Sequence, residues 1–123
     1  HKTFSDIFFE TVKRGLIYRN MNIYKDFISI KKLCEIIYLL IKNNSYGVYN
    51  VSIGKKIYIR RIVKWLNFHN HNKVKYINIK SSFNNENFTL NNDKLMKQIK
   101  IRNNISSLRE ECISISRNFF YKK

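Results

Sequence analysis

The 123-residue sequence contains no alanine, no proline and only three glycines. Three glycines are too few for a comfortable G-x-x-G-x-x-G loop, and neither that motif nor G-x-x-x-x-G-K occurs. The common glycine-rich loops that cradle phosphates are therefore excluded. The longest apolar run, residues 36–41, is far shorter than the roughly 18 residues of a transmembrane helix, so no membrane partner is expected.

Cysteine is also scarce, because the chain has only Cys34 and Cys112. They form neither a C-x-x-C pair nor part of a metal-ligand cluster, and each falls on an apolar helical pattern. This pattern is typical of small buried side chains in a reducing compartment, so we expect a cytoplasmic protein. His69 and His71 have no carboxylate or third ligand near them in the sequence, which favours loop histidines over a metal site.

The charge is strongly one-sided, with 24 basic and 8 acidic residues and a formal net charge of +16. Such an excess normally indicates nucleic acid or an anionic membrane as a partner. The chain is also rich in asparagine, lysine, isoleucine and tyrosine, as the codons of a very AT-rich genome would dictate. Its basic residues are spread along the chain and form no block, which favours drift on a tolerant surface over a nucleic-acid arm.

Hydrophobic spacing predicts an α+β unit, derived from an α/β fold, with a small mixed sheet and packed helices. The expected helices cover residues 5–13, 30–43, 60–66, 91–99 and 107–119. The expected strands cover residues 16–18, 23–30, 47–51 and 73–79, the last of them half-buried. Ser107 followed by Glu110 indicates a capping box at the start of the last helix. The helix over residues 30–43 is expected to bury one face, made of Leu33, Ile36, Ile37, Leu40 and Ile41.

Two short motifs carry a family resemblance. Residues 25–28 read Lys-Asp-Phe-Ile, and about twenty residues later residues 47–54 read Gly-Val-Tyr-Asn-Val-Ser-Ile-Gly. This order resembles the carboxyl-terminal half of the extended short-chain dehydrogenase/reductase family, the NAD(P)-dependent nucleotide-sugar epimerases and dehydratases. There the motifs read roughly Arg-Asp-Phe-apolar and Gly-x-x-Tyr/Phe-Asn-apolar-Gly-x-Gly. Residues 91–95 and 107–110 resemble two later helix starts of the family, so the resemblance spans roughly residues 16–120.

The resemblance implies that residues 1–123 form a single substrate-binding region, which holds the nucleotide sugar. The arginine of the first motif contacts the diphosphate in the family, so Lys25 would supply that charge without the bidentate fork. Lys80 stands where the family has a second arginine that reaches the diphosphate, and Tyr18 is a third expected contact. Asp26 is expected to be a structural acceptor that fixes the turn.

The sequence also departs from the family. Ser52 replaces a usual glycine, and residues 81–83 read Ser-Ser-Phe where the family has Pro-Gly-Asp. The catalytic Tyr-x-x-x-Lys does not occur before Gly15, so no catalytic residue and no metal ligand is expected here. NAD or NADP would belong to the parent enzyme, and neither is expected to bind this chain. Because the chain starts at His1, we expect the tail of a longer protein that lacks its upstream dinucleotide-binding domain, in preference to a trimmed complete chain.

Two further interpretations remain open. The chain is either a small basic nucleic-acid-binding protein, whose lysines contact phosphates, or a non-catalytic remnant of the enzyme. The partners expected from the resemblance are the nucleotide sugar and the missing dinucleotide-binding domain, with a homodimer as an option. Nucleic acid is the less favoured partner.

Overall fold

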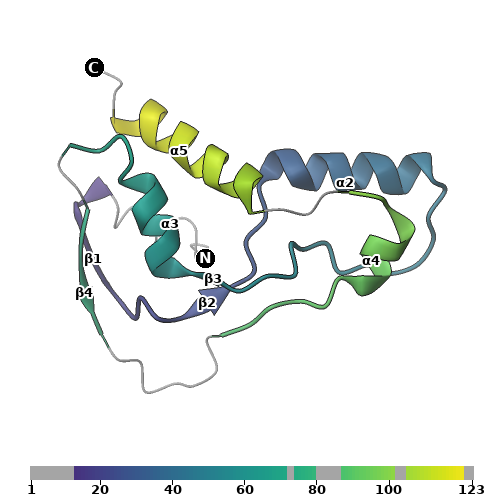
Figure 1. Cartoon of the computed structure of the whole chain (residues 1–123), viewed down its shortest axis with the longest axis horizontal. Helices are drawn as coiled ribbons and strands as arrows, with labels where there is room; N and C mark the ends of the chain where they lie inside the picture. Colours follow the sequence, from purple (N-terminus) through teal and green to yellow (C-terminus); the bar gives the residue numbers. More distant parts are fainter. Residues whose placement is uncertain (1–12, 72–73, 80–86, 102–104, 121–123) are drawn as a thin grey trace.

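The computed structural model describes residues 13–71, 74–79, 87–101 and 105–120 (Figure 1). Within these residues the fold is a small mixed α+β arrangement, as the sequence predicted. Its helices are α2 (Ile30–Lys42), α3 (Ile59–Leu66), α4 (Asp93–Gln98) and α5 (Ser106–Phe120). Its strands are β1 (Leu16–Arg19), β2 (Tyr24–Lys25), β3 (Ile57–Tyr58) and β4 (Lys75–Asn78). The helix predicted over residues 5–13 lies almost wholly outside the described residues.

The strands form two separate two-stranded sheets. β1 and β4 pair in parallel, with Leu16 opposite Lys75, whereas β2 and β3 are antiparallel, with Lys25 opposite Ile57. Parallel strands need a long crossover, and here the chain between β1 and β4 passes through α2 and α3. The prediction of a half-buried strand over residues 73–79 is right only at Val74, which is buried in the core, because all four residues of β4 are exposed.

The first of two hydrophobic clusters lies between α3, α5 and the β2–β3 pair. Five of the eight α3 residues are buried, which gives this short helix a strongly amphipathic character. From α5, Leu108 and Cys112 reach the same cluster, as predicted, and Ile115 packs against it half-buried. Ser116 is fully buried on the same helix face, which the apolar pattern did not predict. The side chain of Phe119 lies outside the described residues.

The second cluster joins α2 to α4 and makes the arm that extends to the right in Figure 1. Its buried members are Ile36, Leu95 and Ile99. α2 begins where predicted, because the Ser29 hydroxyl accepts a hydrogen bond of 3.1 Å from the Lys32 backbone and caps the helix. The predicted inward face of α2 is only partly right: Leu33 and Leu40 are half-buried, whereas Ile37 and Ile41 are exposed.

Two local predictions are wrong. Residues 47–51 form no strand, and Val48 is 84% exposed. α5 begins at Ser106, so Ser107 lies inside the helix and not at the N-cap position where it was predicted. None of the helices in the described part of the chain is both long and apolar enough to span a membrane.

Candidate ligand-binding site

The Asp26 carboxylate joins three segments of the chain. It follows β2, and its Oδ1 accepts a hydrogen bond of 3.0 Å from the backbone N–H of Ile53. Its Oδ2 accepts from the backbone N–H groups of Gly54 at 3.0 Å and Leu90 at 3.3 Å. Hydrogen bonds to an ionised carboxylate are stronger than neutral ones. Asp26 therefore has the structural role that the sequence predicted, and it brings the two resemblance motifs into direct contact.

The loop held by Asp26 is also fixed from its other side, by Asn92. The Asn92 amide donates a hydrogen bond of 2.9 Å to the Ser52 carbonyl oxygen. Gly54 has a φ of +69°, and a Cβ atom there would lie 2.7 Å from the Asn92 Oδ1 atom. Both the backbone conformation and the lack of space thus require glycine at position 54.

The first half of the second motif is bound to the segment around α4 through side chains. The Asn50 amide donates a hydrogen bond of 2.8 Å to the Asn91 carbonyl oxygen. The Lys94 ammonium donates to the Val48 carbonyl oxygen at 2.8 Å and lies 4.6 Å from the centre of the Tyr49 ring. These bonds take the place of a strand ladder, which explains why residues 47–51 are ordered without being a strand.

Lys25 is the only predicted ligand contact whose side chain is among the described residues. It lies half-buried at the end of β2, with its ammonium 5.2 Å from the centre of the Phe88 ring. Residues 87–88 run beside β2: the Asn87 side chain accepts from the Tyr24 N–H at 2.9 Å, and the Phe88 N–H donates to the Tyr24 carbonyl at 3.3 Å. The Lys25 ammonium is therefore next to the segment that Asp26 also binds.

Of the other two predicted contacts, the structure describes only the backbone of Tyr18. Tyr18 lies in β1 opposite Ile77, but its side chain is outside the described residues. Lys80 is outside them entirely. β4 ends at Asn78, whose side chain accepts a hydrogen bond of 3.0 Å from the Met21 backbone, so the end of β4 lies beside the turn that precedes β2.

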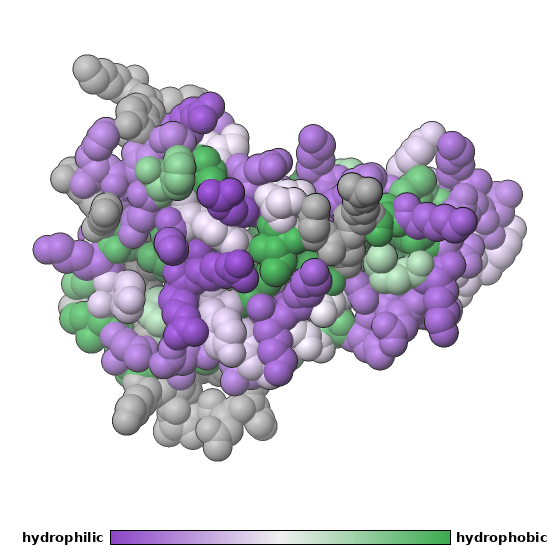
Figure 2. Space-filling model, viewed as in Figure 1, coloured by the Kyte–Doolittle hydropathy of each residue, from purple (hydrophilic) through white to green (hydrophobic). Residues whose placement is uncertain are grey.

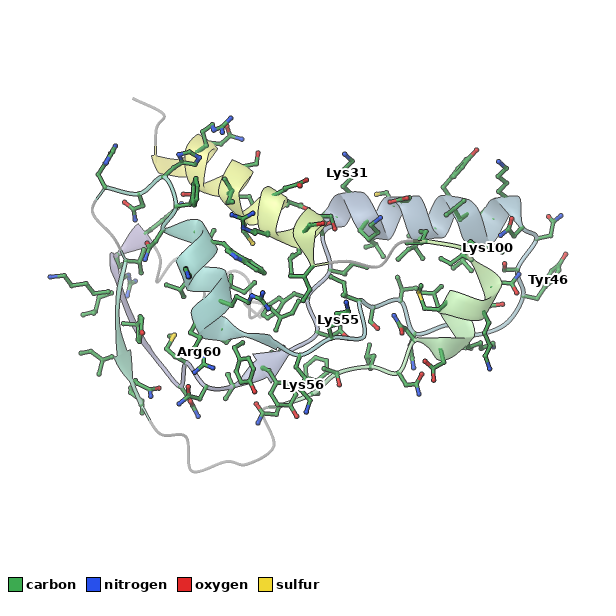
Figure 3. The ribbon with its side chains drawn as sticks, in the orientation of Figure 1. Lys31, Tyr46, Lys55, Lys56, Arg60 and Lys100 are labelled. Atoms are coloured by element: carbon green, nitrogen blue, oxygen red, sulfur yellow. The ribbon has the colours of Figure 1, made fainter. Side chains whose placement is uncertain are left out.

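A second surface was missed by the sequence analysis. Two neighbouring tyrosine rings with a cation at each end, in the order Lys56, Tyr24, Tyr58 and Arg60, form what we term the cation–aromatic row, and Figure 3 shows its two cations near the β2–β3 pair. The Lys56 ammonium lies 5.0 Å from the centre of the Tyr24 ring, whose centre is 5.7 Å from that of Tyr58. The Arg60 guanidinium lies 4.7 Å from the Tyr58 ring centre and donates to the Asn22 side chain at 3.0 Å.

The cation–aromatic row ends at an open cleft of about 530 Å³ between α3 and β4. Among the described residues no acidic side chain lines this cleft; its walls are Tyr58, Arg60, Arg61, Val63, Lys64, Asn67 and Tyr76. These residues converge only because the β2–β3 pairing and the chain reversal after α3 bring distant segments together. For that reason no linear pattern in the sequence indicates the row or the cleft.

The described residues have two further polar features, a cleft of mixed charge and a buried thiol. A cleft of about 640 Å³ beside α2 and α5 has lysines and glutamates on its walls, and Lys32 already pairs with Glu35 at 2.6 Å. Burial, and to a lesser degree the Glu111 carboxylate, raises the pKa of the Cys112 thiol to about 11, so this thiol is a poor nucleophile at neutral pH. In the part of the chain that the structure describes, no three His, Cys, Asp or Glu side chains form a group that could hold a metal ion.

Comparison with protein-family models, with curated proteins and with solved structures finds no match to this chain. The resemblance to the epimerase and dehydratase family therefore stays a prediction from its motifs.

Proposed function

We propose that this chain is the substrate-binding part of an NAD(P)-dependent nucleotide-sugar epimerase, dehydratase or reductase, and that it holds the diphosphate of the nucleotide sugar. One observation supports the proposal above the others. The two motifs of the resemblance meet through residues that belong to them, because Asp26 binds the backbone N–H groups of Ile53 and Gly54, 27 and 28 positions away. A chance pair of motif-like segments would have no reason to touch at these residues.

The charge next to this contact is suited to a diphosphate. The Asp26 carboxylate accepts hydrogen bonds from three backbone N–H groups. Lys25, the residue before it, supplies the positive charge for a diphosphate. A lysine ammonium binds a phosphate oxygen as a point charge, without the fixed fork of arginine. In this proposal Lys80 supplies a second positive charge from the chain after β4, and Tyr18 supplies a hydroxyl group.

The parallel pairing of β1 with β4 is consistent with a fragment of a larger α/β fold. Parallel sheets are nearly always buried on both faces, within sheets covered by helices, so a parallel pair in which all four β4 residues are exposed is unusual. We therefore propose that β1 and β4 continue the sheet of an upstream dinucleotide-binding domain. The described residues do not fit the dinucleotide itself, since Gly15, Gly47 and Gly54 lie in three separate turns. Hydride transfer is accordingly assigned to the missing domain, and this chain binds and orients the sugar nucleotide.

The proposal is tested by calorimetric titration with UDP-glucose and, separately, with pyrophosphate, which carries the diphosphate without base or sugar. We expect one weak site for each probe. Lys25→Ala should abolish most of the binding, whereas Lys42→Ala and Lys97→Ala, which remove exposed lysines of α2 and α4, should leave it unchanged. Equal losses from all three variants, or no binding of either probe to the unaltered chain, would contradict the proposal.

The cation–aromatic row and its cleft favour a second candidate function, the binding of single-stranded nucleic acid. Tyrosine rings between cations offer stacking platforms for bases, and basic side chains neutralise the phosphates. Arg60, Arg61 and Lys64 line the cleft from one helix, and no acidic side chain in the described part of the chain shares its wall with them.

An oligonucleotide titration at about 50 and 200 mM salt separates the two functions, because phosphate binding weakens steeply with salt. If this function is the right one, Arg60→Ala and Lys64→Ala should each lower the affinity several-fold and reduce the salt slope, while Lys25→Ala should not differ from Lys97→Ala. A salt-independent or undetectable interaction would exclude it.

A further inference from the structure

One side of α2 exposes an apolar stripe that nothing in the described structure covers. Ile30, Cys34, Ile37 and Ile41 lie at spacings of four, three and four residues, so they form a single row along the helix. Ile30 is 67% exposed, Ile37 45% and Ile41 71%. Figure 2 shows apolar side chains at the surface of the arm formed by α2 and α4. We refer to these four residues as the α2 stripe.

The α2 stripe lies apart from the contacts that α2 makes within the chain. The buried side of the helix is centred on Ile36, and the charged side chains that line the cleft with α5, such as Lys31 and Glu35, are on the other flank. Both the α2–α4 cluster and the cleft beside α5 thus leave the stripe open. A row of four apolar residues on an otherwise basic surface is the kind of patch that marks an interaction site.

The stripe is complementary to itself when two copies of α2 run antiparallel. In an antiparallel pair, residues whose numbers add up to the same total lie at the same height along the axis. For this stripe the total is 71, so Ile30 lies opposite the partner's Ile41, and Cys34 lies opposite the partner's Ile37. A two-fold symmetric interface requires this property, because residue i must contact j while j contacts i. The alternating spacing of four and three residues is also that of the heptad repeat, in which the side chains of two helices pack as knobs into holes.

Charge separation and the helix dipoles favour the antiparallel arrangement. In a parallel pair in register, the two copies of Lys31, and likewise those of Lys42, would lie level with each other along the axis, on opposite flanks of the helix pair. In the antiparallel pair the two copies of Lys31 are nine residues apart along the axis, or about 13 Å, and those of Lys42 are 13 residues apart, or about 20 Å. These separations exceed the screening length of about 8 Å at physiological salt. Lys31 falls instead near the partner's Tyr38, an exposed ring that can accept a cation on its face. Antiparallel helix dipoles add a favourable term.

We propose that the chain forms a homodimer in which the α2 stripes of two copies pack antiparallel about a two-fold axis. A helix of 13 residues makes a small contact, and interfaces below about 1,200 Å² belong to weak, transient complexes. The dimer is therefore concentration-dependent. It leaves Lys25 and the cation–aromatic row outside the contact, so it does not depend on the proposed function.

Cysteine cross-linking of the full chain tests the geometry. Two variants are made, Ile30→Cys with Cys34→Ser and Ile41→Cys with Cys34→Ser, and the buried Cys112 is kept in both. When the two are mixed and oxidised, a disulfide-linked dimer of unlike chains should form. Each variant alone should stay unlinked, because the introduced cysteines of its two copies would be 11 residues apart, about 16 Å along the axis. A disulfide needs Cα atoms within about 7 Å of each other. Cross-linking of each variant with itself would show a parallel pair and overturn the proposal.

A matched pair of charge variants tests whether the stripe drives association. Ile41→Glu and Lys42→Glu place a carboxylate on neighbouring exposed positions in the last turn of α2, so neither should unfold the chain. Sedimentation of the unaltered chain should show dimer at high micromolar concentration. Lys42→Glu should retain that dimer, and Ile41→Glu should weaken it at least tenfold. A monomer at every concentration, or a dimer that Ile41→Glu leaves intact, would overturn the proposal.

Discussion

Asp26 concentrates more long-range hydrogen bonds on one side chain than any other acidic residue in the described part of the chain. Replacement by asparagine keeps the shape but turns one acceptor into an N–H donor that faces a backbone N–H. Because hydrogen bonds to charged groups contribute about 1.5–3 kcal/mol each, we expect Asp26→Asn to lower the free energy of unfolding by about 2–3 kcal/mol.

Urea denaturation measures this loss against a matched control. Asp93→Asn makes the same chemical change at an exposed position in the first turn of α4, where only the interaction with the helix dipole is lost. That change should cost about 0.5 kcal/mol. Losses of equal size in the two variants would show that Asp26 is not the structural acceptor described above.

The two thiols should differ sharply in reactivity. Cys34 is exposed, whereas Cys112 is buried and its pKa is raised from 9.0 to about 11. A thiol reagent at pH 8 should therefore modify Cys34 quickly and Cys112 only after denaturation. Detection of two fast thiols would contradict the burial of Cys112.

The raised pKa of Cys112 also makes stability depend on pH. Below pH 9 the thiol is protonated in both the folded and the unfolded chain, so its contribution is constant. Between pH 9 and 11 the unfolded chain loses this proton while the folded chain keeps it, and the free energy of unfolding falls. Cys112→Ser should reduce this fall and Cys34→Ser should not, as thermal melts across that pH range would show.

At the scale of elements, the loop that ends at Gly54 is fixed by both conformation and space. Gly54→Ala should destabilise the fold for two reasons. Alanine is strained at the positive φ of this position, and its Cβ atom would collide with the Asn92 side chain. Gly15→Ala is the matched control, because Gly15 has a similar φ of +72° and nothing within 4 Å of an added Cβ.

Strain at a positive φ costs roughly 1–2 kcal/mol for either alanine. Gly54→Ala should lower the free energy of unfolding by at least about 1 kcal/mol more, since the Asn92 bond to Ser52 is lost as well. Urea denaturation of the two variants gives the difference directly. If the two glycines proved equally tolerant of alanine, the close approach of Asn92 to Gly54 would be wrong.

Elements with a strong local signal were predictable from the sequence, and those that depend on distant partners were not. α2 and α3 carry helical periodicity and were predicted within a residue or two. The strand predicted over residues 47–51 fails because its alternating residues are held by Asn50 and Lys94 side-chain bonds instead of a neighbouring strand. Ser116 is buried because its hydroxyl donates to the Leu66 carbonyl at 2.5 Å and accepts from the His69 N–H at 3.2 Å, partners 47 to 50 residues away.

For the molecule as a whole, the sequence located one part of the candidate site and missed another. The motif around Lys25 and Asp26 is local, so it could be found by resemblance, and the structure adds the contacts that Asp26 makes. The cation–aromatic row could not be found in this way, because Tyr24 and Tyr58 meet only through the β2–β3 pairing. The two proposed anion-binding surfaces therefore differ in position, and the position of a bound ligand distinguishes the two proposed functions.

The most direct test of the central claim is to map where a diphosphate binds, residue by residue. Uridine diphosphate is titrated into the ¹⁵N-labelled chain, and the backbone amide shifts are followed. We predict shifts gathered around the Asp26 contact, at Lys25, Asp26, Ile53, Gly54 and Leu90, with saturation at a single weak affinity. Shifts that gather on α3 and the cation–aromatic row, or that spread evenly over the lysine-bearing surface, would contradict the account.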